Sequence, residues 1–250
     1  FVIFPNTVLS QLNLDSLRTE LKSFTIILSD TINDSTLINT YVSSDSLEQY
    51  VICENLKGEI VNVSMLSFAI HRKSIDHLGR ETLEAYYDGD GVLQNIPLVG
   101  RVFIETIYFD SISMQQTNYR RGDRSLEFRT ERYFDEQQRE IERREYNGVL
   151  DLTYKSKCQF DDANHTRTEK LFDSESNLIV NDCGAAIEVI KYPISGFTEN
   201  SNDWLEQRMY SPDMKLVDCY NSYGFDRSYA ILRRIPESDN KVRIVLLNAK

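Results

Sequence analysis

A short motif recurs four times along this chain of 250 residues and constrains its fold more than any other feature. Each copy has an aromatic or apolar pair, usually an aspartate, two or three polar residues, and then an apolar position. The second residue of the pair, or its equivalent, is Tyr87, Phe134, Phe172 and Tyr210, so the copies lie 47, 38 and 38 residues apart. Such a period is typical of arrays in which each unit buries its apolar face against its neighbours.

The residues after each pair have the chemistry of a turn. An aspartate follows directly in three copies, as Asp88, Asp135 and Asp173. An aspartate side chain accepts hydrogen bonds from the backbone of a turn, and a glycine or asparagine a few residues later tolerates positive φ. The glycine is present only as Gly91, and other residues stand at its place in the remaining copies: Gln138, Ser176 and Met214. We therefore predict a hairpin turn after each pair.

A second landmark keeps step with the motif. A glycine precedes a strand-like run in each unit, and these glycines are Gly100, Gly148, Gly184 and Gly224. The runs cover residues 102–109, 150–160, 186–194 and 227–235. In the second run, apolar residues such as Tyr154 and Cys158 alternate with polar ones such as Lys155 and Lys157, which places one face inward and one in water.

These observations predict the fold class. Each unit supplies about two long strands, and a single hairpin is not stable alone in water. We expect a mainly β protein, an array of antiparallel β-hairpin repeats over residues 67–250 that forms an extended twisted sheet or a β-solenoid-like stack. Residues 135–146 are rich in Glu, Gln and Arg and have helical propensity. We expect a turn and a returning strand there, because the repeat register places them so.

At these residues the chain resembles the bacterial tyrosine–aspartate repeat proteins, which include the Rhs-type YD repeats. Residues 86–93 fit the Tyr-Tyr-Asp-x-x-Gly-x-Leu core, and residues 178–186 fit the continuation of the longer repeats. The resemblance covers about residues 68–250. The period near 38 is about twice that of the Rhs repeat, so the enclosing shell of that family is not carried over. The resemblance implies a secreted or surface-exposed protein that serves binding, adhesion or encapsulation, and it implies no catalytic residues.

Residues 1–66 show no repeat, and we expect them to form a small α+β cap that covers the first open edge of the sheet. The pattern predicts helix starts at residues 13–22 and 43–52 and strands at residues 24–28 and 59–68. A separate ligand-binding domain is the alternative, with an apolar pocket that involves Tyr41, Tyr50 and Phe68.

Composition narrows the partners. The net charge of −11 and the pI of about 4.8 disfavour nucleic acid and anionic membrane surfaces. The four cysteines form no CxxC pair and only three histidines are present, so we predict neither a metal site nor a cofactor. Cys183 and Cys219 lie in adjacent repeats, where a disulfide and free thiols both remain open. Residues 1–5 fit either the outer end of a signal or membrane anchor preceding Phe1 or a short first strand.

These expectations favour a non-catalytic, extracytoplasmic repeat scaffold, periplasmic or at the cell surface, for protein interaction or surface assembly. The partner and the oligomeric state stay open. The first alternative is a sensory or ligand-binding ectodomain with its pocket in the N-terminal part. The second is a glycan-acting enzyme of unrecognised type.

Overall fold

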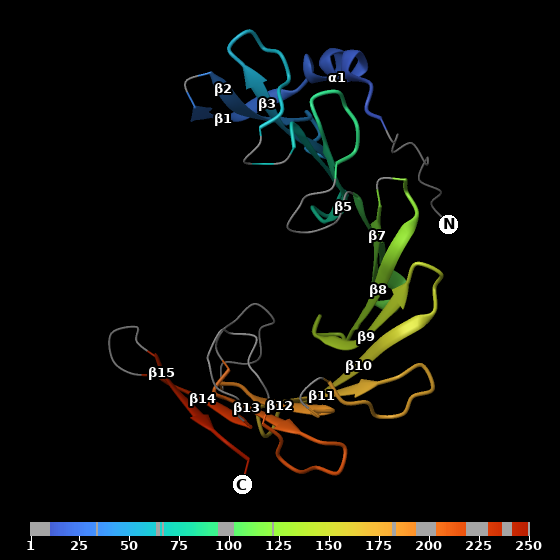
Figure 1. Ribbon diagram of the computed structural model, residues 1–250, viewed down its shortest axis with the longest axis vertical. Helices are drawn as coiled ribbons and strands as arrows, with labels where there is room; N and C mark the ends of the chain where they lie inside the picture. The colour runs from blue at the N-terminus through green and yellow to red at the C-terminus, as the bar shows by residue number, and fades with distance from the viewer. Residues whose placement is uncertain are drawn as a thin grey trace. The chain divides into compact units, whose positions relative to one another are not determined.

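The protein is mainly β, and its strands follow one another in a single open sheet (Figure 1). A computed structural model describes residues 11–249 except 34, 64–65, 67, 95–102, 122, 182–183, 194–203, 219–229 and 237–241. Within these residues, 15 antiparallel strands occur in the order β1 to β15, so each strand neighbours the one before it in sequence. The predicted array of antiparallel hairpins is confirmed, in the form of an open sheet.

The elements have the following bounds. Helix α1 spans Leu14–Leu21 and a short 3-10 helix, η1, spans Asp110–Ile112. The first strands are β1 (Thr25–Asn33), β2 (Thr36–Val42), β3 (Glu48–Asn55), β4 (Ile70–Ile75), β5 (Glu81–Tyr87), β6 (Phe103–Phe109) and β7 (Met114–Arg120). The others are β8 (Leu126–Phe134), β9 (Glu140–Asn147), β10 (Leu152–Asp161), β11 (Thr166–Phe172), β12 (Ile187–Lys191), β13 (Glu206–Tyr210), β14 (Ile231–Pro236) and β15 (Val242–Leu247).

The chain divides into two compact units, which we describe separately. The first unit contains residues 1–108, 115–129 and 147–150, and the second contains residues 109–114, 130–146 and 151–250.

One turn design recurs between the strands. At Asp88, the carboxylate accepts hydrogen bonds from the backbone N–H groups of Asp90 (3.0 Å) and Val92 (2.8 Å), and the Gly91 N–H donates to the Asp88 carbonyl (3.0 Å). The same bonds form around Asp135 and Asp173. The carboxylate thus accepts the hydrogen bonds that water would otherwise accept from these backbone N–H groups. This explains why an aspartate follows the aromatic pair.

The fourth residue of each of these turns, and of the turn that begins at Ser211 in the last copy, has positive φ. The values are 77° for Gly91, 61° for Gln138, 69° for Ser176 and 63° for Met214. A residue with a side chain in this left-handed region costs about 1–2 kcal/mol, so three of the four copies carry strain that glycine would relieve. Alignment of the four motif copies in the sequence therefore identifies each of these strained positions.

Glycine is present at position 91 for a second reason. A Cβ atom there would lie 2.4 Å from the Leu12 carbonyl oxygen, closer than van der Waals contact allows. The Leu12 N–H donates to the Gly91 carbonyl (2.7 Å), and Gln11 forms a β-bridge with Val92. The chain before α1 therefore lies directly against this turn, and only glycine fits.

The landmark glycines do not occupy one equivalent position. Gly184 is the fourth residue of the Asn181 turn and has φ 84°. Gly148 is the second residue of the Asn147 turn, where the positive φ belongs to Leu150, and a Cβ at Gly148 would lie 2.5 Å from the Leu126 carbonyl oxygen. The other predicted landmarks, and the two cysteines for which a disulfide and free thiols stayed open, lie outside the described residues: Gly100, Gly224, Cys183 and Cys219.

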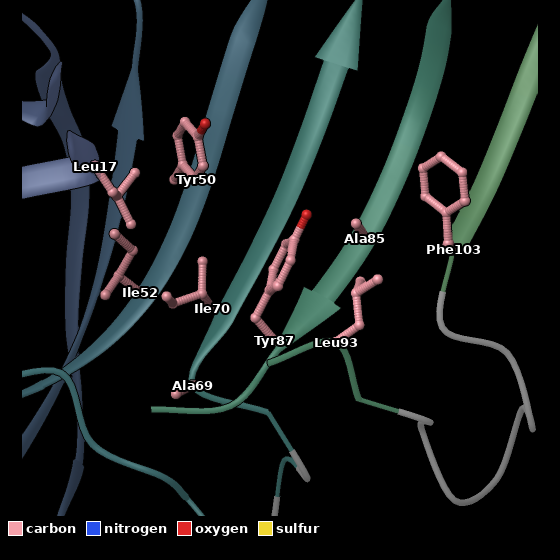
Figure 2. Packing of buried hydrophobic residues seen from close by; sticks show 9 residues of the cluster. All are labelled: Leu17, Tyr50, Ile52, Ala69, Ile70, Ala85, Tyr87, Leu93 and Phe103. Atoms are coloured by element: carbon pink, nitrogen blue, oxygen red, sulfur yellow. The ribbon is translucent and has the colours of Figure 1, made fainter. Parts of the chain in front are cut away.

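The core of the first unit lies between α1 and one face of β3 to β6 (Figure 2). Helix α1 is confirmed at the predicted place, and Asn13 caps it by accepting a hydrogen bond from the Ser16 N–H (2.9 Å). The helix contributes Leu17 to a cluster that also contains Tyr50, Ile52, Ala69, Ile70, Ala85, Tyr87, Leu93 and Phe103. The aromatic Tyr87 of the first motif copy is 1% exposed, so this copy anchors the core as well as a turn.

Two expectations for the N-terminal residues are wrong. Residues 46–52 form no helix, because Ser43 begins a hairpin turn and strand β3 follows. The Ser43 hydroxyl accepts a hydrogen bond from the Glu48 N–H (2.9 Å), a turn contact made by the same residue types that cap helices. The described part of residues 59–68 forms isolated β-bridges instead of a strand, at Ile60, Val63 and Phe68.

The N-terminal residues also supply strands β1, β2 and β3 to the sheet itself. Strand β1 is exposed, with Ile27 61% accessible to solvent. The pairing of β1 with β2 skips one residue between Ile26 and Leu28, and such a bulge blunts an edge strand against further pairing.

Candidate interaction surface

Strand register segregates charge between the two faces of β10 to β12. Residues directly opposite one another in an antiparallel pair share a face. The pairs Lys157 with Lys170 and Thr166 with Lys191 therefore lie on one face, which we call the lysine face. It carries four lysines on these three strands: Lys155, Lys157, Lys170 and Lys191. The carboxylate that these strands place on the same face, Asp161, accepts hydrogen bonds from the Asn164 N–H (3.0 Å) and Nδ2 (2.7 Å).

Two of the lysines oppose each other directly. Lys157 and Lys170 are Cα partners across β10 and β11, and like charges in that position destabilise a sheet by about 0.2–1 kcal/mol. The Lys157 ammonium lies 3.7 Å from the Glu142 carboxylate, and its side chain is 51% exposed. Among the described residues, neither Lys170 nor Lys191 forms an ion pair. The chain has a net charge of −11, whereas this face carries a net positive charge.

A shallow, open hollow adjoins the lysine pair. Its volume is about 540 Å³. Ile141 and Phe172 line it, together with Cys158 and Phe160, which the register assigns to the opposite face of the sheet. Arg139 also lines it and is fixed, because its guanidinium pairs with Asp135 (2.8 Å) and with Asp162 and lies 4.1 Å from the centre of the Phe160 ring. The hollow therefore combines apolar side chains, an arginine whose guanidinium is already paired, and the two exposed lysines.

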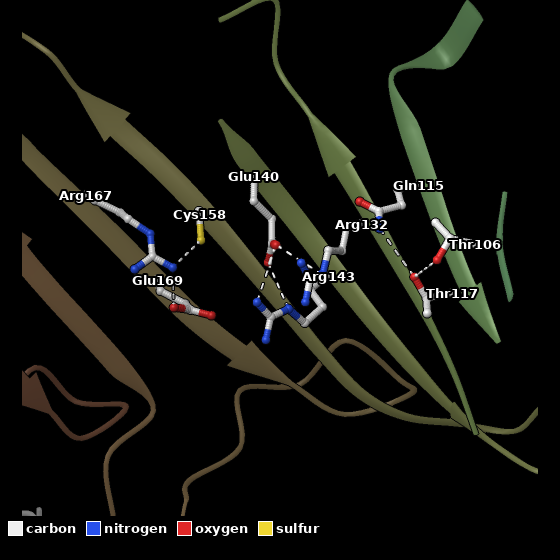
Figure 3. Close-up of polar contacts among 9 residues, drawn as sticks. All are labelled: Thr106, Gln115, Thr117, Arg132, Glu140, Arg143, Cys158, Arg167 and Glu169. Carbon is white, nitrogen blue, oxygen red and sulfur yellow. Dashed lines mark hydrogen bonds and ion pairs between the residues drawn. The ribbon is translucent and has the colours of Figure 1, made fainter. Parts of the chain in front are cut away.

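The opposite face of the second unit holds two separate clusters of paired polar side chains (Figure 3). The buried Glu140 accepts a hydrogen bond from Arg143 (2.9 Å) and lies 3.6 Å from Arg132. Further along, Arg167 donates to Glu169 (2.6 Å) and to the Cys158 sulfur (3.1 Å). Removing one partner of such a pair leaves an uncompensated charge, at a cost of about 3–5 kcal/mol when it is buried. The two clusters stabilise this face.

Two groups of this face have perturbed protonation. Burial and the nearby Glu169 carboxylate raise the pKa of the Cys158 thiol to about 11, so the thiol is protonated at neutral pH and is a poor nucleophile. Burial also raises the pKa of Glu188, which faces Glu169 across β11 and β12 and accepts a hydrogen bond from Gln207.

The first unit has a separate polar cluster on β4 and β5. His71 Nε2 lies 2.9 Å from the Glu84 carboxylate, and the Lys73 ammonium lies 3.8 Å from it. The hydrogen bond from His71, with further contributions from Tyr86 and Lys73, lowers the pKa of Glu84 to about 2. The His71 ring stacks on Tyr86 with 4.3 Å between ring centres. The cluster joins the two strands through these side-chain contacts.

The three residues predicted for an N-terminal pocket do not meet. Tyr50 is 2% exposed and packs in the core, and the Tyr41 beside it donates a hydrogen bond to Glu54 (2.9 Å). Phe68 contacts the ring of His71, with 5.8 Å between ring centres. His71 and its neighbour Arg72, the partner of Tyr50, point to opposite faces, so Phe68 and Tyr50 lie on different sides of the sheet.

No protein-family model matches this chain, and no curated protein matches it. The resemblance to tyrosine–aspartate repeats therefore depends on the motif itself. Within the part of the chain that the structure describes, no group of three or more His, Cys, Asp or Glu side chains is arranged to hold a metal ion. No helix in that part is both long and apolar enough to cross a membrane.

Sequence reasoning missed two features. The turn design also occurs at Asn55 and Asp76, each followed three residues later by a glycine of positive φ, Gly58 and Gly79. The Asn/Asp-x-x-Gly spacing is the signal that identifies both. Alternation placed Lys155 and Lys157 together on the solvent face of their strand, but sequence reasoning missed that Lys170 and Lys191 share this face.

Proposed function

We propose that this protein is a non-catalytic, extracytoplasmic repeat scaffold that binds a protein partner, at the cell surface or in the periplasm. The observation that carries the proposal is the lysine face, an exposed, charged sheet face with an open hollow, on strands whose opposite face is stabilised by paired polar side chains. A sheet face with an excess of positive charge is suited to recognition. The resemblance to secreted and surface-exposed repeat proteins supports the compartment.

The two alternatives have less support. A ligand-binding ectodomain with an N-terminal pocket requires Tyr41, Tyr50 and Phe68 to converge, and these residues lie on two faces of the sheet. A glycan-acting enzyme requires two carboxyl groups that flank a substrate. Glu169 and Glu188 oppose each other, but Arg167 lies 2.6 Å from the first and 3.7 Å from the second and links them.

The proposal is tested by site-specific photocrosslinking in the native host. A photoreactive phenylalanine derivative replaces one residue at a time: the half-buried Thr168 on the lysine face, or one of the exposed residues Thr31 on β1, Leu78 on the Asp76 turn and Val149 on the Asn147 turn. We expect one reproducible protein adduct from a subset of positions, together with protease sensitivity of the chain on cells whose inner membrane is intact. Folded variants that give no protein adduct from any position contradict the scaffold function.

A further inference from the structure

We propose that the lysine face binds an acidic peptide segment in extended conformation, with one apolar side chain of the peptide seated in the adjoining hollow. This inference rests on the proposed scaffold function and gives its partner a chemistry. The occupant follows from three features of the second unit: the excess of positive charge on this face, the spacing of the lysines and the apolar lining of the hollow.

Charge selects an anionic partner. Four lysines and one carboxylate lie on this face of β10 to β12, and Asp161 is already occupied by Asn164. On the adjoining strands, Glu142 lies 3.7 Å from Lys157, and Glu206, the partner of Lys191, is paired with Arg208 and Arg233. On the opposite face of the same strands, Arg167 is balanced by Glu169 and Glu188. A carboxylate bound between Lys157 and Lys170 would be attracted to both ammonium groups and would offset their mutual repulsion. An anionic ligand therefore lowers the electrostatic energy of this pair.

Spacing selects an extended chain. Lys155 and Lys157 are separated by one residue on β10, so their Cα atoms lie about 7 Å apart along the strand. Alternate side chains of an extended peptide have the same separation. A peptide running along β10 therefore directs successive acidic side chains of one edge at Lys155 and Lys157, while Lys170 flanks the second of them.

The hollow distinguishes a peptide from other polyanions. Its apolar lining includes Ile141, which is 37% exposed, and Phe172, the cross-strand partner of Lys155. A polyphosphate has no apolar group to place there, and a sulfated polysaccharide has no alkyl or aromatic side chain. A leucine or aromatic side chain of a peptide buries apolar surface in the hollow, and its acidic neighbours remain over the lysines.

The test uses fluorescence anisotropy with the full chain and a fluorescein-labelled peptide of about ten residues, about 33 Å when extended. The peptide alternates Glu with Ser and has one central Glu replaced by Leu. Binding is measured at about 0.15 M and about 1 M salt. The protein variants are Lys157→Gln, Lys170→Gln and their combination. The matched control is Lys57→Gln, which removes the same charge from an exposed turn of the first unit.

We expect each lysine-face substitution to weaken binding about threefold and the double substitution about tenfold, with Lys57→Gln unchanged. Replacing the peptide leucine by serine weakens binding as well, and high salt abolishes most of it. An equal loss for Lys57→Gln would reduce the effect to general charge attraction and would overturn the proposal. Dextran sulfate that outcompetes the peptide, with no contribution from the leucine, would overturn it in favour of a polyanion.

The crosslinking experiment separates this inference from the scaffold function. A partner that crosslinks at Thr168, and is released from the protein by the acidic peptide, supports both. A partner that crosslinks at Thr31 or Leu78 but not at Thr168, and ignores the Lys157→Gln/Lys170→Gln variant, refutes the lysine-face proposal and leaves the scaffold intact.

Discussion

Gly91→Ala and Gly184→Ala form a matched pair that tests the account of the turns. Both glycines have positive φ, 77° and 84°, but a Cβ at Gly184 meets no atom within 4 Å, whereas one at Gly91 meets the Leu12 carbonyl oxygen at 2.4 Å. Left-handed backbone costs alanine about 1–2 kcal/mol, and the stiffer unfolded chain returns about 0.4–1 kcal/mol. We therefore expect Gly184→Ala to destabilise its unit by about 1 kcal/mol.

Gly91→Ala carries the same strain and also displaces the chain before α1. The hydrogen bond from Leu12 to Gly91 is lost at a net cost of about 1 kcal/mol, and part of the Leu12 packing is lost with it, which gives a total of about 3 kcal/mol. Hydrogen exchange measures the local opening free energy in each unit, with the Leu12 and Val92 amides as reporters. Equal effects of the two substitutions, or an unchanged Leu12 amide in Gly91→Ala, would refute the reasoning.

Four further substitutions or treatments have definite expected outcomes. Ser176→Gly relieves positive φ without a clash and stabilises the second unit by about 0.5 kcal/mol in urea unfolding. Because the pKa of Glu84 is lowered from 4.5 to about 2, its carboxylate stabilises the fold above about pH 4.5, and this stabilisation is lost as the pH falls toward 2. We expect Glu84→Gln to flatten this part of the curve of stability against pH. His71→Gln is the control, because it removes the largest cause of the lowered pKa. Lys170→Glu places opposite charges across β10 and β11, so we expect it to raise the free energy of unfolding by about 0.5–1 kcal/mol at low salt and to lose that gain at about 1 M salt. An unaltered melting temperature at low salt would contradict this expectation. Brief alkylation at pH 8 followed by peptide mapping leaves Cys158 unmodified until the protein unfolds, since its pKa is about 11.

The turns were predictable because their chemistry is local. Asp88, Asp135 and Asp173 accept hydrogen bonds from backbone groups within four residues, so a sequence motif contains all the partners. The helical propensity of residues 135–146 did not prevail, because β9 pairs along its length with β10. The same locality explains the error at Ser43, where a serine followed by Asp45 suits a helix cap and a hairpin turn equally.

The lysine face was not predictable to the same extent. Alternation places Lys155 and Lys157 on one side of β10, but the position of Lys170 opposite Lys157 depends on register. That register is set by the turn after β10, in which Asp161 binds Asn164 and His165 has φ 54°. A turn one residue longer would move Lys170 to the other face, so the site depends on a local geometry that composition does not reveal.

The lysine pair links stability to recognition in a testable way. A sheet of antiparallel hairpins has no structural need for two lysines in direct opposition, and Lys170→Glu would stabilise it. If the pair serves a partner, the substitution that most stabilises the free protein is also the one that most weakens peptide binding. Lys170→Glu should therefore raise the unfolding free energy and lower the peptide affinity together, whereas Met214→Gly, which relieves a positive φ in the turn after β13, should raise stability and leave the affinity unchanged. A lysine pair with no binding role would show the first effect without the second, and the two measurements on these two variants distinguish the cases.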